Sequence, residues 1–362
     1  AISGNYAIVG AYGEDHDAND NPLFKGAAYI FERDTSGNWI QKQKIVASDR
    51  QNDDKFGNSV AISGNYAIVG AYGEDHDASG TSDSTIDDPD YERNAGSAYI
   101  FERDTSGNWS QVQKIVANDR QQYDEFGRSV AISGNYAIVG AHGKDHDASG
   151  NPVEKGEIYT FEGSAYIFER DTSGNWIQKQ KILANDRQEN DRFGYSVDIS
   201  GNYAIVGAYW EDHDASGTST STDASANYQS VAGSAYIFER DINGNWSQVQ
   251  KLVANDRQQN DYFGYSVAIS GNYAIVGAYW EDHDASGNPL RKGAAYIFER
   301  NTNGNWSQVQ KIVANDRQQD DYFGWCVAIS GNYAIVAAYR EDHDASGINY
   351  KPDAGSAYIF EG

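Results

Sequence analysis

The stretch FGNSVAISGNYAIVGAY, from Phe56 to Tyr72, reads as two short strands joined by a tight turn. Its two runs, Phe56–Ser63 and Asn65–Tyr72, are rich in Val, Ile and Tyr, residues that favour extended backbone. The Gly64-Asn65 pair between them is a two-residue hairpin signal. Both runs are nearly all apolar or small, so we expect strands that are buried on both faces.

Two more strand candidates complete the unit. Ser97–Arg103 (SAYIFER) and Trp109–Ala117 (WSQVQKIVA) are joined by Asp104–Asn108, a short loop that contains Gly. In the last run, the apolar residues Trp109, Val112 and Ile115 alternate with polar ones. A single four-stranded unit cannot bury both of its faces, so neighbouring units must stack on it.

The same unit recurs along the whole chain. Repeats start near residues 1, 61, 131, 198, 268 and 328, each marked by the string ISGNYAIV. No segment reads as a helix. We therefore interpret residues 1–362 as a single all-β domain, a β-propeller of four-stranded antiparallel blades in which the sixth blade is incomplete. A linear solenoid of the same units is the alternative arrangement.

The two ends of the repeat array do not match. The second and third strands of the unit occur six times, whereas the fourth strand and the FG half of the first strand occur five times. A closed ring of six blades would thus lack one fourth strand and one FGxSV segment. Three explanations stay open: part of a longer array, part of a seven-bladed ring, or a strand supplied by a neighbouring molecule through β-augmentation.

Composition narrows the function classes. The chain has 28 Lys and Arg against 53 Asp and Glu, a net charge of −25, which argues against a nucleic-acid binder. The apolar runs are too short for membrane insertion. The chain has no Met, so we expect a processed product or a segment of a longer protein. Its one cysteine, Cys326, stands where other repeats have Ser and is interpreted as a neutral replacement.

The FG pair, the Val69-Gly70-Ala71 that closes the second strand and the GSAYIFER strand together resemble the FG-GAP repeat. This repeat builds the head propeller of integrin α subunits and occurs in many bacterial secreted proteins, to which the likeness is closest. The resemblance covers essentially the whole chain. It implies a propeller, an extracellular or cell-surface location, and a role in adhesion or surface architecture.

The chain also departs from the family pattern at two places. Integrin-type repeats carry a calcium loop between the first and second strands, where this chain has only Ser-Gly-Asn. The family's metal site therefore cannot be carried over to that turn. The sixth repeat has Val336-Ala337-Ala338 in place of Val-Gly-Ala.

An acidic loop, EDHDASG in the second repeat, follows each second strand. Oxygens at alternate positions of such a loop suit Ca²⁺, but the bidentate carboxylate is missing. The loop after the fourth strand should emerge on the same face, because strand direction alternates within a blade, and its Asp119 or Asp124 is the candidate source. In the other interpretation, arginines of that loop pair with the aspartates and pin adjacent blades. The candidate calcium ligands are Asp15, Asp17, Asp75, Asp77, Asp145, Asp147, Asp212, Asp214, Asp282, Asp284, Asp342 and Asp344. The candidate arginines are Arg50, Arg120, Arg187, Arg257 and Arg317.

Six equivalent copies argue against catalysis, which needs one differentiated site, and no nucleophile elbow or phosphate loop is present. We therefore predict a non-enzymatic extracellular structural or adhesive protein whose partners are other copies of itself, surface proteins or glycans. The alternative is a glycan-binding propeller that uses exposed aromatic side chains such as Trp210 and Trp280. These two replace glycines that stand beside the acidic loop in the first three repeats.

Overall fold

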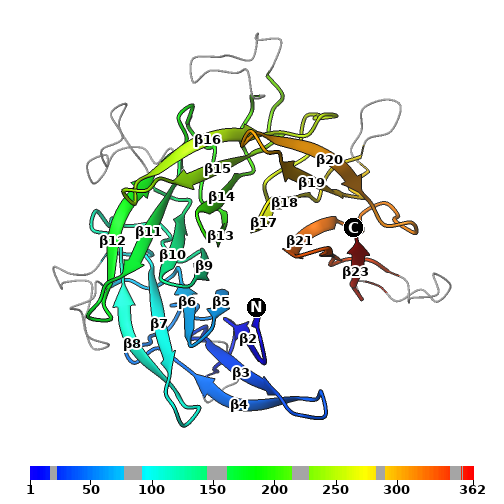
Figure 1. The fold of residues 1–362 in the computed structure, drawn as a ribbon. Coiled ribbons are helices and arrows are strands. Elements are labelled where there is room, and N and C mark those ends of the chain that lie inside the picture. The colour runs from blue at the N-terminus through cyan, green and yellow to red at the C-terminus, as the bar shows by residue number, and fades with distance from the viewer. Residues whose placement is uncertain are drawn as a thin grey trace. The chain divides into compact units, whose positions relative to one another are not determined.

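The computed structural model describes residues 1–16, 23–76, 92–144, 161–213, 228–282, 290–342, 352 and 354–362. These residues form 23 β-strands (Figure 1). The described part of the chain contains no helix long and apolar enough to cross a membrane. The strands assemble into six antiparallel sheets, five with four strands and one with three. The predicted β-propeller is confirmed, with each sheet as one blade.

The chain divides into two compact units, Ala1–Leu183 and Ala184–Gly362. Unit 1 holds blade 1 (β1 Ile2–Ser3, β2 Tyr6–Ala11, β3 Ala27–Arg33, β4 Trp39–Ile45), blade 2 (β5 Ser59–Ser63, β6 Tyr66–Ala71, β7 Ser97–Arg103, β8 Trp109–Ile115) and blade 3 (β9 Ser129–Ser133, β10 Tyr136–Ala141, β11 Ser164–Arg170, β12 Trp176–Ile182). Unit 2 holds blade 4 (β13 Ser196–Ser200, β14 Tyr203–Ala208, β15 Ser234–Arg240, β16 Trp246–Leu252), blade 5 (β17 Ser266–Ser270, β18 Tyr273–Ala278, β19 Ala294–Arg300, β20 Trp306–Ile312) and blade 6 (β21 Phe323–Ser330, β22 Tyr333–Ala338, β23 Ser356–Glu361). In each unit the first strands of adjacent blades lie side by side (Figure 1).

Blade 2 shows how the local sequence makes the turns. β5 and β6 form the predicted two-residue hairpin, since Ser63 pairs with Tyr66 and Gly64 takes a φ of +59°. The loop from β7 to β8 is an Asx turn, because the Asp104 carboxylate accepts the N–H groups of Ser106 and Asn108, both at 2.8 Å. The predicted strands are thus confirmed, with β5 starting three residues after Phe56.

A β-bulge in the fourth strand divides its apolar side chains between two faces. Phe101 pairs with Gln111 and Ile100 with Gln113, so Val112 is an extra residue that faces no partner. Val112 is 47% exposed. Trp109 packs against the core shared with blade 1, and Ile115 against the core shared with blade 3. The simple alternation predicted for this strand is wrong, because the bulge changes which face each residue occupies.

The Trp residues of three fourth strands, Trp109, Trp176 and Trp306, are held by the preceding blade. The Trp176 ring meets the Tyr66 ring edge-on at 5.9 Å. The Gln113 amide donates to the backbone carbonyl of Trp176 and accepts its N–H, both at 2.8 Å, while the Arg170 guanidinium lies 4.8 Å from the Tyr66 ring. We call this Tyr and Gln pair the tryptophan seat. It recurs for Tyr6 and Gln43 with Trp109, and for Tyr203 and Gln250 with Trp306.

The glycines of the repeat make direct backbone contact between blades. A Cβ placed on Gly70 would lie 2.0 Å from the carbonyl oxygen of Gly127 in the next blade, and one on Gly277 would lie 2.0 Å from that of Gly324. Only glycine permits this approach. In blade 6 the equivalent residue is Ala337, which carries a Cβ where the other blades have glycine.

Candidate functional site

The loops that follow the second and fourth strands lie together, as predicted. The Gly73 N–H donates to the carbonyl of Asp54 at 3.2 Å, and the Gln51 amide lies 3.5 Å from Nδ1 of His76. The acidic loop and the fourth-strand loop thus form one polar surface at each blade junction.

A buried ion pair lies at the centre of this surface. Nζ of Lys114 is 3.0 Å from Glu74 of its own blade and 2.8 Å from Asp49, which follows β4 of blade 1. Glu74 is 2% exposed and also accepts the Ser97 hydroxyl at 2.5 Å and the His76 N–H at 2.8 Å. Burial opposes ionisation of Glu74, yet the hydrogen bond from His76 and the charge of Lys114 hold its pKa below the usual range.

The same lysine recurs in other blades and joins neighbours. Lys251 contacts Asp186 at 2.7 Å and Glu211 at 2.9 Å. Lys311 contacts Asp256 and Glu281, both at 2.6 Å. The sequence analysis did not identify these lysines and glutamates as ion-pair partners. A signal was present, because every complete fourth strand contains Gln-Lys and most Asp-His-Asp motifs follow a glutamate.

Blade 3 has the reversed charge at the glutamate position. Lys144 replaces the glutamate, is fully buried and lies 3.0 Å from Asp124. Lys181, the fourth-strand lysine, then contacts only Asp119, at 2.7 Å, among the ion pairs of described residues. Burial and, to a smaller extent, the charge of Lys144 lower the pKa of Lys181.

The candidate calcium ligands that the structure describes have protein partners. Asp15 lies 3.8 Å from Lys25, and Asp282 lies 3.2 Å from Lys292. Asp75 accepts the Asn94 N–H and Asp212 the Val231 N–H, each at 2.6 Å. Within the described ranges no three His, Cys, Asp or Glu side chains gather around a metal-sized space. Calcium binding stays a prediction.

Seven of its candidate ligands lie outside the described residues: Asp17, Asp77, Asp145, Asp147, Asp214, Asp284 and Asp344.

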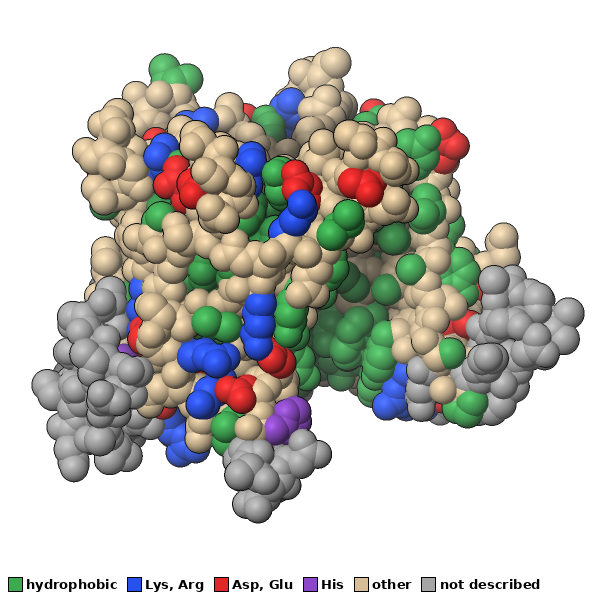
Figure 2. Space-filling model, turned by 90° about the horizontal axis from the view of Figure 1, so that it is seen from below, with side chains coloured by type: hydrophobic (Ala, Val, Ile, Leu, Met, Phe, Trp, Pro, Cys, Tyr) green, Lys and Arg blue, Asp and Glu red, His purple; other side chains and the backbone are tan. Residues whose placement is uncertain are grey.

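Three of the candidate arginines form ion pairs with the acidic loops. Arg50 lies 3.7 Å from Asp15, Arg317 lies 3.7 Å from Asp282, and Arg257 lies 3.8 Å from Glu211. Each pair joins two loops of one blade, whereas the lysines join adjacent blades. On the face seen in Figure 2, basic and acidic side chains lie next to one another. In the described chain, arginines thus form ion pairs with the acidic loops of blades 1, 4 and 5.

A second set of carboxylates is buried at the junctions: Asp54, Asp124, Asp191, Asp261 and Asp321. Asp54 is 4% exposed and accepts the Gln51 N–H at 2.5 Å. Burial, and then the neighbouring Glu74 charge, raise the pKa of Asp54 to about 8. The same causes raise the pKa of Asp261 to about 8. Burial in the folded protein thus favours the protonated form of both carboxyl groups.

Unit 2 carries a cluster of contacting aromatic rings that we call the aromatic band. Trp325 lies at its centre, 4.6 Å from Tyr265 and 4.3 Å from Tyr339 between ring centroids. Nearly all of its rings are partly exposed. The band comprises Tyr195, Tyr209, Trp210, Tyr262, Tyr265, Tyr279, Trp280, Tyr322, Trp325 and Tyr339.

Both predicted contact aromatics belong to this band. Trp210 meets Tyr209 edge-on at 6.0 Å and lies 4.6 Å from the Arg192 guanidinium. Trp280 lies 4.9 Å from Tyr262. The other members were missed, although blades 2 and 3 have Asn58 and Arg128 where blades 4 to 6 have aromatics after the FG pair.

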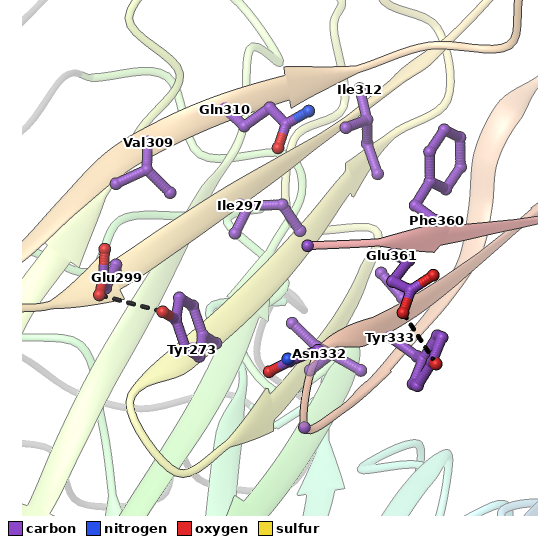
Figure 3. A pocket seen from close by; sticks show the side chains of 14 residues that line it. Tyr273, Ile297, Glu299, Val309, Gln310, Ile312, Asn332, Tyr333, Phe360 and Glu361 are labelled. Atoms are coloured by element: carbon purple, nitrogen blue, oxygen red, sulfur yellow. Dashed lines mark hydrogen bonds between the residues drawn. The ribbon is translucent and has the colours of Figure 1, made fainter.

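A groove of about 300 Å³ lies between blade 5 and blade 6 (Figure 3). Its two walls carry matching hydrogen bonds, Tyr273 to Glu299 and Tyr333 to Glu361, both at 3.0 Å. We call it the β23 groove. Residues that line it include Tyr273, Ile297, Gln310, Tyr333, Phe360 and Gly362.

The sequence profile of the FG-GAP repeat matches residues 39–101, 109–161, 176–238, 246–298 and 306–360. The chain belongs to the FG-GAP repeat family. Each matched repeat begins at or near the Trp of a fourth strand. A family repeat thus supplies the outer strand of one blade and then strands of the next, so consecutive FG-GAP repeats interlock.

No curated protein matches the chain. Among solved structures, a crystal structure of a protein from Lactobacillus plantarum is similar over 99% of this chain and 99% of its own length, with 11% identity and a TM-score of 0.42.

Proposed function

We propose that this FG-GAP chain is a non-enzymatic extracellular structural or adhesive module that self-associates through the open edge of blade 6. The observation that carries the proposal is the state of β23. In the described residues β23 pairs only with β22, whereas the equivalent strand of every other blade has a fourth strand on its outer side. An unpaired strand edge is a template for pairing with another chain.

The side chains around this edge support the same proposal. Ile359 of β23 is 73% exposed, whereas its counterparts Ile30 and Ile100 are fully buried. Tyr333 and Ile335 of β22 are 54% and 42% exposed. Blade 2 buries the equivalent side chains against the following blade, so in blade 6 they form an apolar face that can contact another molecule.

The experiment is a concentration series by mass photometry and sedimentation velocity, with negative-stain microscopy of the largest species. We expect association that grows with concentration and that Ile359→Lys weakens. Ile242→Lys is the matched control, because Ile242 is fully exposed in the turn that precedes β16. A wild-type chain that stays monomeric throughout the series would refute self-association.

A second candidate function, glycan binding, is favoured by the aromatic band. Partly exposed Tyr and Trp rings suit stacking against sugar rings, with the tyrosine hydroxyl groups as hydrogen-bond partners. The band is confined to unit 2, so a glycan would bind to blades 4 to 6. A glycan array with Trp280→Ala tests it, and Val249→Ala, an exposed residue on β16, is the control. Equal binding by both variants would exclude the band as the site.

A further inference from the structure

We propose that Lys181 of blade 3 is a modification site whose side-chain amine forms an imine with small aldehydes, because Lys144 replaces one of the two carboxylates that hold the equivalent lysine of other blades. The proposal concerns only the junction of blades 2 and 3, both in unit 1, and is independent of the proposed self-association. It gives blade 3 a reactive group that blades 2, 4 and 5 do not share.

The lysine of an ordinary junction lies between two carboxylates. Lys114 is 2.8 Å from Asp49 and 3.0 Å from Glu74, and Lys251 and Lys311 have the equivalent pairs of contacts. Two anions at this distance favour the ammonium form of the side chain. An ammonium group has no lone pair, so in this form the lysine cannot add to a carbonyl carbon.

Blade 3 differs from this arrangement at one position. Lys144 stands where the acidic loops of the other five blades have glutamate, and its side chain is fully buried. Its Nζ donates to the backbone carbonyl of Asp119 at 2.5 Å, to the Asp124 carboxylate at 3.0 Å and to the Gln121 side chain at 3.3 Å. Three acceptors thus hold a buried positive charge at the position of the missing glutamate.

Lys181 keeps a single carboxylate partner and some access to solvent. Its Nζ lies 2.7 Å from Asp119, and its side chain is 17% exposed, against 7% for Lys114 and 6% for Lys251. Asp119 is shared, because it also accepts the Tyr166 hydroxyl at 2.9 Å. One side chain of the junction is therefore both less neutralised and more accessible than its counterparts.

The charges around Lys181 favour its neutral form. The charged groups that face it are Asp119, Asp124 and Lys144. Burial and then the charge of Lys144 outweigh the two carboxylates and lower the pKa of Lys181. At Lys311 burial acts in the same direction, yet the hydrogen bonds to its two carboxylates raise the pKa above the usual range. Desolvation and a second cationic group are the two ways in which proteins activate a lysine amine, and Lys181 has both.

The reaction needs no oxidant or reductant. The neutral amine adds to the carbonyl carbon of an aldehyde, the π electrons of the C=O bond pass to oxygen, and proton transfer gives a carbinolamine. Loss of one water molecule leaves the imine, and addition of water reverses the reaction. The Asp119 carboxylate, 2.7 Å from Nζ, is placed to accept the proton that the amine releases.

The first test is reductive methylation of the full chain with limiting formaldehyde and cyanoborohydride, which reduces the imine to a stable amine. Peptide mass spectrometry gives an initial rate for each lysine at pH 7.5. Lys311 is the internal reference, because it is more exposed, 28%, but contacts two carboxylates. One pKa unit changes the neutral fraction of an amine about tenfold, so we expect Lys181 to react at least about fivefold faster than Lys311. A rate at or below that of Lys311 overturns the proposal.

The second test asks whether Lys144 is the cause. Lys144→Glu restores the residue of the other blades and should lower the rate at Lys181 to that of Lys311 and move its pH profile upwards. Lys144→Met, which removes only the charge, should act in the same direction, and it decides the test if the glutamate variant does not fold by circular dichroism. Lys179→Gln is the matched control on the same strand, since Lys179 pairs with Glu169 on the surface, and should change neither rate nor profile. An unchanged pH profile at Lys181 in the folded Lys144 variants overturns the proposal.

Discussion

Trp176→Ala and Trp39→Ala together test whether the tryptophan seats hold the blades to one another. The two residues occupy the same position of a fourth strand, but Trp176 is 2% exposed against the Tyr66 ring, whereas Trp39 is 42% exposed. A large aromatic removed from a core costs about 3–5 kcal/mol. We therefore expect Trp176→Ala to lower the free energy of unfolding by an amount in that range.

The expected difference between the two variants follows from their exposure. A fully buried Trp removes roughly 250 Å² from water, so the extra exposure of Trp39 corresponds to about 100 Å². At ~25 cal/mol per Å², this area is worth about 2.5 kcal/mol. Trp39→Ala should thus cost only about 1–2 kcal/mol.

The assay is urea unfolding followed by circular dichroism, at submicromolar protein so that copies do not associate. The hydrogen bonds from Gln113 reach backbone atoms of Trp176 and survive the substitution, so the measured change reports the indole alone. Equal destabilisation by the two substitutions would refute the argument, because burial in the seat would then contribute nothing.

Three further predictions concern the junctions. Lys114→Met should lower the free energy of unfolding by about 3–5 kcal/mol, since it removes the lysine that pairs with the buried Glu74. Lys44→Met should lower it by less than about 1 kcal/mol, because the ion pair of Lys44 with Glu14 is exposed. Thermal unfolding compares the two variants. The pKa values of Asp54 and Asp261 are raised to about 8, so the folded state keeps protons that the unfolded state releases at lower pH. The free energy of unfolding therefore falls as the pH rises towards 8, by roughly 1.4 kcal/mol per pH unit for each titrating group. Unfolding free energies should therefore be higher at pH 5.5 than at pH 8, and Asp54→Asn should flatten this slope; an unchanged slope contradicts the assignment. Gly70→Ala places a Cβ 2.0 Å from a carbonyl oxygen and should lower the free energy of unfolding by roughly 3 kcal/mol. Gly64→Ala, whose Cβ meets no atom, should lower it by about 1 kcal/mol. Similar losses for the two variants would contradict the backbone contact at Gly70.

The blades could be predicted from the sequence because their signals are local. The Gly64-Asn65 hairpin and the Asp104 turn depend on adjacent residues, and both are confirmed. The bulge at Val112 could not be predicted, since it depends on how β8 registers against β7. Apolar spacing alone therefore gave a simple alternation where the structure has two separate faces.

The candidate site was predicted less well, because its contacts join residues of different repeats. The aspartates of the acidic loop were visible as a repeated motif, yet the buried ion pair uses Glu74 with Lys114, 40 residues later in the chain. Proximity of Lys114 to Asp49 depends on the stacking of two blades. Only the three-dimensional junction shows that the repeated Lys and Glu are partners.

The offset between repeat and blade has a consequence at the level of the gene. Each family repeat begins at or near a fourth-strand Trp, such as Trp109 or Trp176, directly after an Asn that ends the same Asx turn. Deleting residues 109–175 would join Asn108 to Trp176 and rebuild an intact turn, and each remaining Trp would find a seat of the same residues. Recombination between repeats could therefore change the number of blades without creating an unfamiliar junction.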